Sequence, residues 1–155
     1  MVLASIRESD TKFVIIDTPP SASKGVGKII ELADLVVVPV IPSPNDLRAV
    51  GETLDLIEAA DKPALFVLTN AATNAKLTNQ ALIILSQHGT IAAVDSKPVI
   101  IHTRTDYRTA MVDGRTAREI KPKSKAAEEI AALWIAIKQR LEKEERRRGR
   151  STATA

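Results

Sequence analysis

The stretch "ADLVVVPVIPSPNDL", residues 33–47, joins a continuous apolar run to the beginning of a helix. The run at 35–40 is rich in β-branched residues and has no charge, which is typical of a strand covered on both faces in a parallel sheet. Ser43 is a suitable N-cap, Pro44 at position N1 needs no N–H donor, and Asp46 at N3 can serve as a capping-box acid. A buried strand that leads directly into a capped helix indicates a layered α/β fold.

Apolar residues recur at helical spacing after this start and predict a helix over 44–60. Its buried face is formed by Leu47, Val50, Leu54 and Ile57. The other apolar runs predict strands at 12–17, 64–69 and 98–103, and the other periodic segments predict helices at 75–87, 105–112 and 124–147. Strands and helices therefore alternate, which predicts an α/β fold with a mostly parallel sheet and helices on both faces.

The composition supports one compact domain with a basic tail. The 155 residues are 45% hydrophobic, enough for one sizeable core, and we assign this domain to residues 1–145. Residues 146–155 follow the last apolar stripe and are expected to be disordered. The absence of cysteine excludes disulfides and thiolate metal sites. No apolar run approaches the roughly 20 residues that a membrane helix needs, so we expect a cytoplasmic protein without a membrane partner.

The stretch "SASKGVGK", residues 21–28, looks like the glycine-rich loop that binds nucleotide phosphates. A standard loop reads G-x-x-x-x-G-K-[ST], and its final hydroxyl binds magnesium. Here Ala22 replaces the first glycine and Ile29 replaces the hydroxyl residue, so the motif is incomplete. We interpret the stretch as a loop that opens a short helix continuing through Ile30 and Leu32.

Asp17 ends the apolar run "FVIID" and is followed by "TPP". Open parallel sheets place ligand chemistry at the carboxyl ends of their strands, and an acid at such a place binds magnesium in phosphate-loop NTPases. The alternative is that Asp17 caps the following turn. From the spacing alone, both interpretations stay open.

Four segments follow one another over residues 12–141: "FVIIDTPPS", "ADLVVVPVIPSPNDL", "FVLTN" and "PVIIHTRTDYRTAMVDGRTAREIKPKSKAAEEI". Taken together, they resemble the ParA/MinD family of deviant Walker ATPases, and most closely the ParA branch, which partitions plasmids and chromosomes. The resemblance implies a P-loop NTPase-like fold of the SIMIBI type, in which ATP and Mg²⁺ bind at the carboxyl ends of the strands. It also implies that two subunits enclose the ATP between them.

The resemblance assigns roles to the residues around the first predicted strand. Asp17 matches the Walker B acid, a catalytic residue that lies near magnesium and contacts it directly or through water. Thr18, Pro19 and Pro20 match the switch segment that senses the γ-phosphate. Residues 21–28 then fall just after this switch and not in the phosphate loop.

The ends of two later strands carry the nucleotide-binding residues that the resemblance implies. Asn70 ends the third predicted strand, where relatives place a side chain near the adenine; its alternative role is to cap the end of the strand. His102, Thr103 and Arg104 follow the last predicted strand, where relatives wrap a loop around the base.

The resemblance also implies non-specific binding to DNA through basic residues of the C-terminal part. The segment "KPKSKAAEE", residues 121–129, is similar to the family's basic stretch before its last helix. The alternative is a solvated surface, because acids interrupt the basic residues. The expected phosphate contacts are Lys123 and Lys125, with Arg104, Arg108, Arg115 and Arg118 on neighbouring loops. Other implied partners are a ParB-like centromere-binding protein and a second subunit, either an identical chain or a full-length ATPase.

The family's first segment has no counterpart in these residues. Relatives begin with a strand, a phosphate loop with a signature lysine, a helix and a second strand, whereas this sequence starts just before its Walker B run. We therefore expect a fold truncated at its N-terminus, with an exposed apolar sheet edge. Without a phosphate cradle, we do not expect the chain to hydrolyse ATP alone. The alternative function is a non-catalytic module of this family that binds DNA or a partner.

Overall fold

The structure, a computed structural model, describes residues 10–19, 24–72 and 76–152. The main sheet has four strands, which are β1 (Val36–Val40), β2 (Ala64–Ala71), β3 (Thr90–Ile91) and β6 (Ile100–His102). β2 is central: β1 pairs along one of its edges, while β3 and β6 pair along the other. All of these pairings are parallel, which confirms the predicted sheet.

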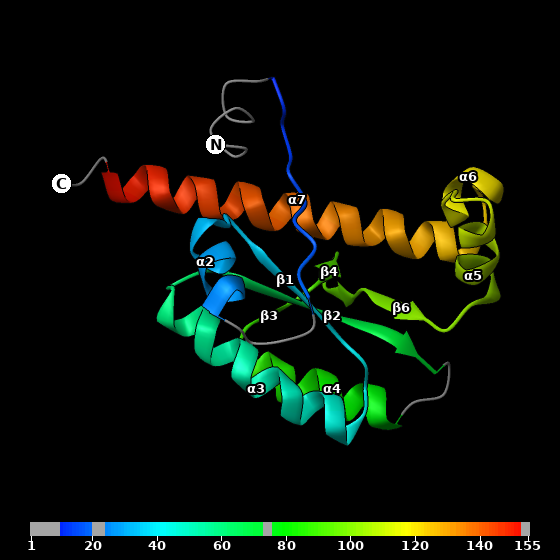
Figure 1. The fold of residues 1–155 in the computed structure, drawn as a ribbon, viewed down its shortest axis with the longest axis horizontal. Helices are drawn as coiled ribbons and strands as arrows, with labels where there is room; N and C mark the ends of the chain where they lie inside the picture. The colour runs from blue at the N-terminus through cyan, green and yellow to red at the C-terminus, as the bar shows by residue number, and fades with distance from the viewer. Residues whose placement is uncertain (1–9, 20–23, 73–75, 153–155) are drawn as a thin grey trace.

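Helices cover both faces of the sheet, as predicted (Figure 1). One face packs against α2 (Lys24–Leu32), α3 (Pro44–Ala59) and α4 (Lys76–Ser86). The long helix α7 (Lys125–Thr152) crosses the other face. The α/β fold class is therefore confirmed.

The central strand β2 shows why the sequence needs both layers. Phe66 and Leu68 pack among the apolar residues of α2, α3 and α4, whereas Leu65 and Val67 pack beside Ala136 of α7. Side chains alternate between the two faces of a strand, so the first five residues of β2 are all buried. A continuous apolar run is the pattern that such a doubly covered strand requires.

The predicted N-cap and N1 proline of α3 are confirmed, but the capping box is not, because the Ser43 N–H donates to the Ile41 carbonyl at 2.7 Å and not to Asp46. Ser43 Oγ accepts a hydrogen bond from the Asp46 N–H at 3.1 Å, and Pro44 occupies the first turn. The Ser43 hydroxyl donates in turn to the Asp46 carboxylate, so the acid binds the cap hydroxyl. The local sequence is thus sufficient to end β1 and to begin α3.

Replacing Ser43 by alanine is expected to lower the free energy of unfolding by about 1 kcal/mol, because the Asp46 N–H loses its acceptor. Ser86→Ala is the matched control, since the Ser86 hydroxyl only bonds the Ile83 carbonyl on an exposed helix surface. For this control we expect a change of about 0.5 kcal/mol or less. Urea unfolding followed by circular dichroism measures both variants. Equal losses in the two would contradict the capping role of Ser43.

The predicted strand at 98–103 is shorter in the structure because a hairpin precedes it. β4 (Ala93–Val94) and β5 (Lys97–Pro98) pair in antiparallel fashion. Asp95 and Ser96 form the connecting turn with φ of 49° and 64°, the positive values that a two-residue hairpin turn requires. Only Ile100–His102 then remains for the parallel strand β6.

Two short helices follow β6. α5 (Thr105–Val112) is confirmed, and it is followed by Gly114 with φ of 67°, in the left-handed region that favours glycine. α6 (Ala117–Ile120) was not predicted. It is held by a capping box in which Thr116 and Glu119 bond each other's backbone N–H, and these bonds lower the pKa of Glu119.

The last helix is longer than predicted. Residues 146–152, which we expected to be disordered, belong to α7. Glutamate, lysine and arginine have good helix propensity, and ion pairs support this end of the helix. Arg140 pairs with Glu144 at 3.0 Å, and Arg148 pairs with Asp34 at 2.8 Å. None of the helices in the described ranges is long and apolar enough to cross a bilayer.

The prediction of a strand at 12–17 is wrong. The segment is extended, but it pairs with no strand of the described part of the chain (Figure 1). The Phe13 ring instead meets the edge of the Trp134 ring of α7, with ring centroids 4.9 Å apart. A run of β-branched residues becomes a strand only where a neighbouring strand takes up its N–H and C=O groups.

Candidate functional site

The carboxyl ends of β2 and β6 bring two predicted nucleotide-binding residues together. Ala71 of β2 pairs with His102 of β6, and the Thr103 N–H donates to the Ala71 carbonyl at 3.0 Å. Beside this pairing, the Thr103 hydroxyl donates to Asn70 Oδ1 at 2.8 Å. Parallel strands end at the same side of a sheet, and this is the side where open α/β sheets place ligands.

Asn70 has a left-handed backbone conformation and an exposed side chain. Its φ of 50° lies in the left-handed region, which asparagine adopts more readily than most residues. The residue is exposed, and the bond from Thr103 orients its amide. The amide NH₂ group can donate and the Thr103 oxygen can accept, so the pair can recognise the polar edge of a heterocycle.

Next to this edge, the Glu129 carboxylate of α7 accepts hydrogen bonds from three residues of β6 and the chain that follows it. His102 donates its backbone N–H at 3.2 Å and its Nδ1 proton at 2.7 Å. Arg104 donates from Nε at 3.0 Å and from Nη2 at 2.6 Å, and the Tyr107 hydroxyl donates at 2.9 Å. A carboxylate only accepts hydrogen bonds, so Nδ1 of the His102 ring carries a proton in this contact.

These contacts favour the charged forms of Glu129 and Arg104 and the neutral form of Tyr107. Burial alone would raise the pKa of Glu129, but the hydrogen bonds from Arg104, His102 and Tyr107 outweigh burial and lower it. The hydrogen bond to Glu129 raises the pKa of Arg104. Burial, followed by the hydrogen bond to Glu129, raises the pKa of Tyr107. The cluster is therefore an anion that accepts hydrogen bonds from the Arg104 cation, from His102 and from the Tyr107 hydroxyl.

Arg104 is bound to Glu129 in this cluster, and its side chain is only 22% exposed. It therefore lies apart from the exposed basic residues with which we had grouped it as a DNA contact. Its predicted contact with a nucleotide stays a prediction. Glu129 and Tyr107 were not predicted as site residues from the sequence. The available signal was spacing: Glu129 falls between Ala126 and Leu133, which both lie on the side of α7 that packs into the protein.

The predicted magnesium and switch residues lie in the extended segment before α2. Asp17 and Pro19 are exposed and Thr18 is half-buried, while Pro20 lies outside the described residues. Within the described ranges, no group of three or more histidine and acidic side chains could hold a metal ion. The described residues therefore do not form a magnesium site by themselves, and the role of Asp17 stays a prediction.

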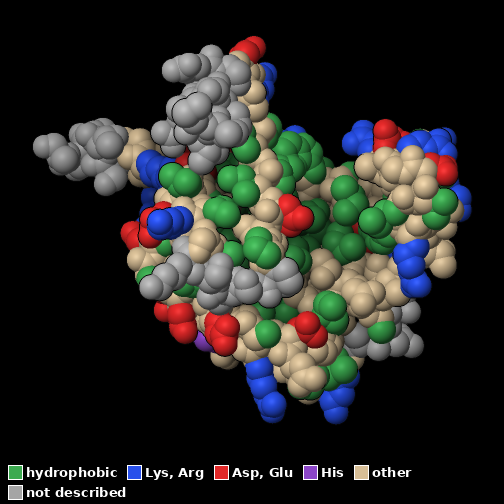
Figure 2. Space-filling view, in the orientation of Figure 1, with side chains coloured by type: hydrophobic (Ala, Val, Ile, Leu, Met, Phe, Trp, Pro, Cys, Tyr) green, Lys and Arg blue, Asp and Glu red, His purple; other side chains and the backbone are tan. Residues whose placement is uncertain are grey.

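The predicted DNA contacts gather at the end of the molecule formed by α5, α6 and the start of α7. Figure 2 shows Lys and Arg side chains over this end. Acids neutralise part of it: Arg115 pairs with Asp113, and Lys121 pairs with Asp106, each at 2.9 Å. The predicted contacts that are exposed here are Lys123, Lys125, Arg108, Arg115 and Arg118.

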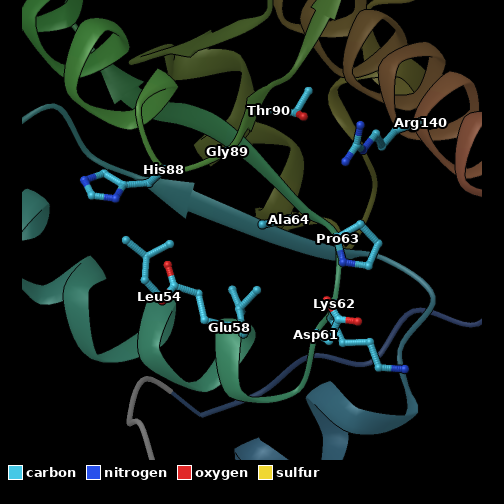
Figure 3. Close-up of a pocket in the computed structure, with 11 residues that line it drawn as sticks. Leu54, Glu58, Asp61, Lys62, Pro63, Ala64, His88, Gly89, Thr90 and Arg140 are labelled. Atoms are coloured by element: carbon cyan, nitrogen blue, oxygen red, sulfur yellow. The ribbon is translucent and has the colours of Figure 1, made fainter.

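A separate cleft of about 330 Å³ lies at the amino ends of β2 and β3 (Figure 3). Ala64 and Thr90 begin these strands, and Arg140 of α7 reaches toward them. Nη2 of Arg140 pairs with Glu144, while Arg140 Nε is buried without a hydrogen-bond partner among the described residues. The lining includes none of the predicted site residues that the structure describes, so this cleft is distinct from the carboxyl-end site.

Comparisons with known proteins give one relevant similarity. The chain is 29% identical over 125 residues to "Maintenance of carboxysome distribution protein A" of Halothiobacillus neapolitanus (strain ATCC 23641 / c2). The match covers 76% of this chain and 56% of that protein, so the chain spans little more than half the length of its relative. No protein-family profile and no solved structure matches the chain. The similarity is distant and supports a relationship to the ParA/MinD-like family at most.

Proposed function

We propose that the chain is part of a ParA-like ATPase of plasmid or chromosome partitioning, which acts as an ATP-dependent dimer on non-specific DNA. The ordered family segments over residues 12–141 carry this proposal. The similarity to a carboxysome distribution protein supports it. In this proposal the cargo can therefore be a large protein assembly as well as DNA. A ParB-like protein would connect the ATPase to its cargo.

In this proposal, the pair formed by Asn70 and Thr103 contacts the adenine base at the carboxyl ends of β2 and β6. Glu129 fixes Arg104 beside that pair. ATP and Mg²⁺ remain expectations from the family, and a magnesium site would need ligands in addition to Asp17. The 155 residues contain no complete phosphate-loop motif, so we expect no ATP hydrolysis by this chain alone.

The coding DNA upstream of the Met1 codon tests the ATPase assignment. An in-frame K-G-G-x-G-K-[ST] motif after a strand-like run would support a longer ParA-like enzyme. An in-frame stop codon with no such motif before Met1 would contradict it and would leave the second candidate function.

The second candidate is a non-catalytic module of the same family that binds DNA or a partner protein. The exposed basic residues around α5, α6 and the start of α7 favour it, because they need no nucleotide to contact phosphates. This function predicts that the chain binds DNA without ATP, and that salt weakens the binding.

Replacing Lys123 and Lys125 together by alanine is expected to weaken retention on non-specific duplex DNA. The slope of log affinity against log salt should become less steep by about two, because each lysine neutralises one phosphate. Lys97→Ala/Lys143→Ala is the control, since it removes the same charge from exposed positions outside this surface. Fluorescence anisotropy across a salt series measures both. Equal slopes in the two variants, or no binding by the wild type at low salt, would contradict a DNA-binding surface here.

A further inference from the structure

The exposed basic residues at the end of the molecule formed by α5, α6 and the start of α7 are carried by separate elements. Arg108 lies on α5 and Arg118 on α6, while Lys123 lies just before α7 and Lys125 begins it. Several cations contact the phosphates of one duplex together only where their elements are already held at a fixed spacing, because ordering a loose element on binding costs affinity. The contacts that hold these helices together therefore decide how many phosphates this surface can reach.

Apolar packing contributes little to holding these helices. Among the described residues, neither apolar cluster of the core includes a member of α5 or α6. A methyl side chain buries little area, so packing through alanines stabilises the arrangement only weakly. Polar contacts then have a large share in fixing α5 against α7. The buried residues of α5, α6 and the first turn of α7 are Ala110, Ala117, Ala126 and Ala127.

The Tyr107 hydroxyl joins α5 to α7. Its oxygen lies 3.1 Å from the Ala126 carbonyl oxygen and 2.9 Å from a carboxylate oxygen of Glu129. The hydroxyl has one proton, so these two acceptors share it. Glu129 is held in turn by the Arg104 guanidinium and by the backbone N–H of His102. These two hydrogen bonds of Tyr107, the α5–α7 tie, thus connect α5 to an acid that is itself fixed to the end of β6.

The α5–α7 tie lies directly beside two of the predicted phosphate contacts. Tyr107 precedes Arg108 on α5. On α7, Ala126 follows Lys125. Tyr107 is half-buried and Ala126 is buried, whereas both cations are exposed, so the tie is on the inner side of the two helices and the cations are on the outer side. Fixing Tyr107 against Ala126 therefore also fixes the spacing between the backbones that carry the two cations.

We propose that Tyr107 and Glu129 are positioning residues of a DNA-binding surface. By holding α5 against α7, they keep Arg108 at the spacing from Lys125 at which both cations contact phosphates of one duplex. Neither positioning residue touches the DNA, because the Tyr107 hydroxyl is bonded within the protein and Glu129 is a shielded acid. The inference rests on the second candidate function, DNA binding without nucleotide, and adds how its cations are arranged.

Tyr107→Phe tests the tie, because it keeps the ring, removes only the hydroxyl and takes no cation from the surface. We expect weaker binding to non-specific duplex DNA, and a slope of log affinity against log salt that is less steep by about one, because one phosphate contact is lost. Thr109→Ala is the matched control, since it also removes a hydroxyl from α5 but at an exposed position. It should leave affinity and slope unchanged. Fluorescence anisotropy across a salt series measures all of these proteins.

A double variant tests whether the hydroxyl acts through Arg108. Arg108→Ala removes the same phosphate contact directly and should also make the slope less steep by about one. Tyr107→Phe/Arg108→Ala should then have the slope of Arg108→Ala alone, because the contact that the tie positions is already absent. Losses of slope that add in the double variant would show that the hydroxyl acts elsewhere and would overturn the positioning role.

Hydrogen exchange tests the tie without DNA. The amides of α5 should exchange severalfold faster in Tyr107→Phe than in the wild type, whereas those of α4, on the other side of the sheet, should be unchanged. Equal exchange of α5 in both proteins, faster exchange of α4 as well, or a wild-type salt slope in Tyr107→Phe would each overturn the positioning role. A wild type that binds no DNA at low salt would contradict the DNA-binding function itself, and the positioning role with it, even where exchange of α5 is faster in the variant.

Discussion

Replacing Phe66 by alanine is expected to lower the free energy of unfolding by about 3–5 kcal/mol. The Phe66 side chain is completely buried at the centre of the cluster between β2 and the helices α2, α3 and α4. The ring packs directly against the backbone of Gly89. Even a single added carbon there would be too close, because a Cβ atom on Gly89 would lie 2.8 Å from Phe66 Cε2. The truncation therefore removes apolar contacts and leaves a cavity in a rigid part of the sheet.

Denaturant unfolding followed by circular dichroism measures this loss. Ile83→Ala is the control, because it also truncates a large apolar side chain but at a position that is 63% exposed on α4. Its change is expected to be about 0.5 kcal/mol or less. A loss below about 1.5 kcal/mol for Phe66→Ala would contradict the packing described for this cluster.

Replacing Glu129 by glutamine is expected to destabilise the protein by about 3 kcal/mol. The change keeps the shape of the side chain but removes the charge that compensates Arg104. Both side chains are largely shielded, with 13% of Glu129 and 22% of Arg104 exposed, so the uncompensated cation is poorly solvated. Glu142→Gln is the control, because its pair with Arg146 is 3.7 Å long and mostly exposed. We expect about 0.5 kcal/mol or less for that control.

The stabilisation by Glu129 should depend on pH in a defined direction. Because the folded state lowers the pKa of this carboxyl below its ordinary value of 4.5, the carboxylate stabilises the fold above that value. The advantage is lost as the pH falls through the folded pKa, where the folded carboxyl also takes up a proton. The stability difference between wild type and Glu129→Gln should therefore be constant above the ordinary pKa of 4.5 and shrink as the pH falls below it. A difference that stays constant below that pKa as well would assign the effect to packing instead of charge.

Most of the main elements could be predicted because their signals are local. The helix predicted at 44–60 is Pro44–Ala59 in the structure, and the strand predicted at 35–40 is Val36–Val40. A cap acts within one helical turn and an apolar face repeats every few residues, so a short window contains the information. The β4–β5 hairpin was missed because Asp95 and Ser96 are a weaker turn signal than glycine.

The candidate site could be predicted only in part. Asn70 and Thr103 come together because they lie at the carboxyl ends of two paired parallel strands, β2 and β6. The family resemblance had implied that both lie near the base. The acid that organises the neighbouring cluster was not predicted, because Glu129 is 27 residues from His102 and 22 from Tyr107 along the chain. Sequence spacing contains no measure of which of several acids will meet these donors.

The alternation of strands and helices and the start of α3 follow from local sequence signals. The cover of the sheet does not: the run at 35–40 was expected to be covered on both faces, but Val37 of β1 is 37% exposed and it is β2 that is buried on both faces. The tertiary structure also leaves the run at 12–17 outside the sheet, continues α7 through residues 146–152 and makes Glu129 a shielded acceptor. The physical reason is the same in each case. Local propensity favours a conformation, but backbone groups, apolar faces and buried charges are stabilised only by partners that other parts of the fold supply.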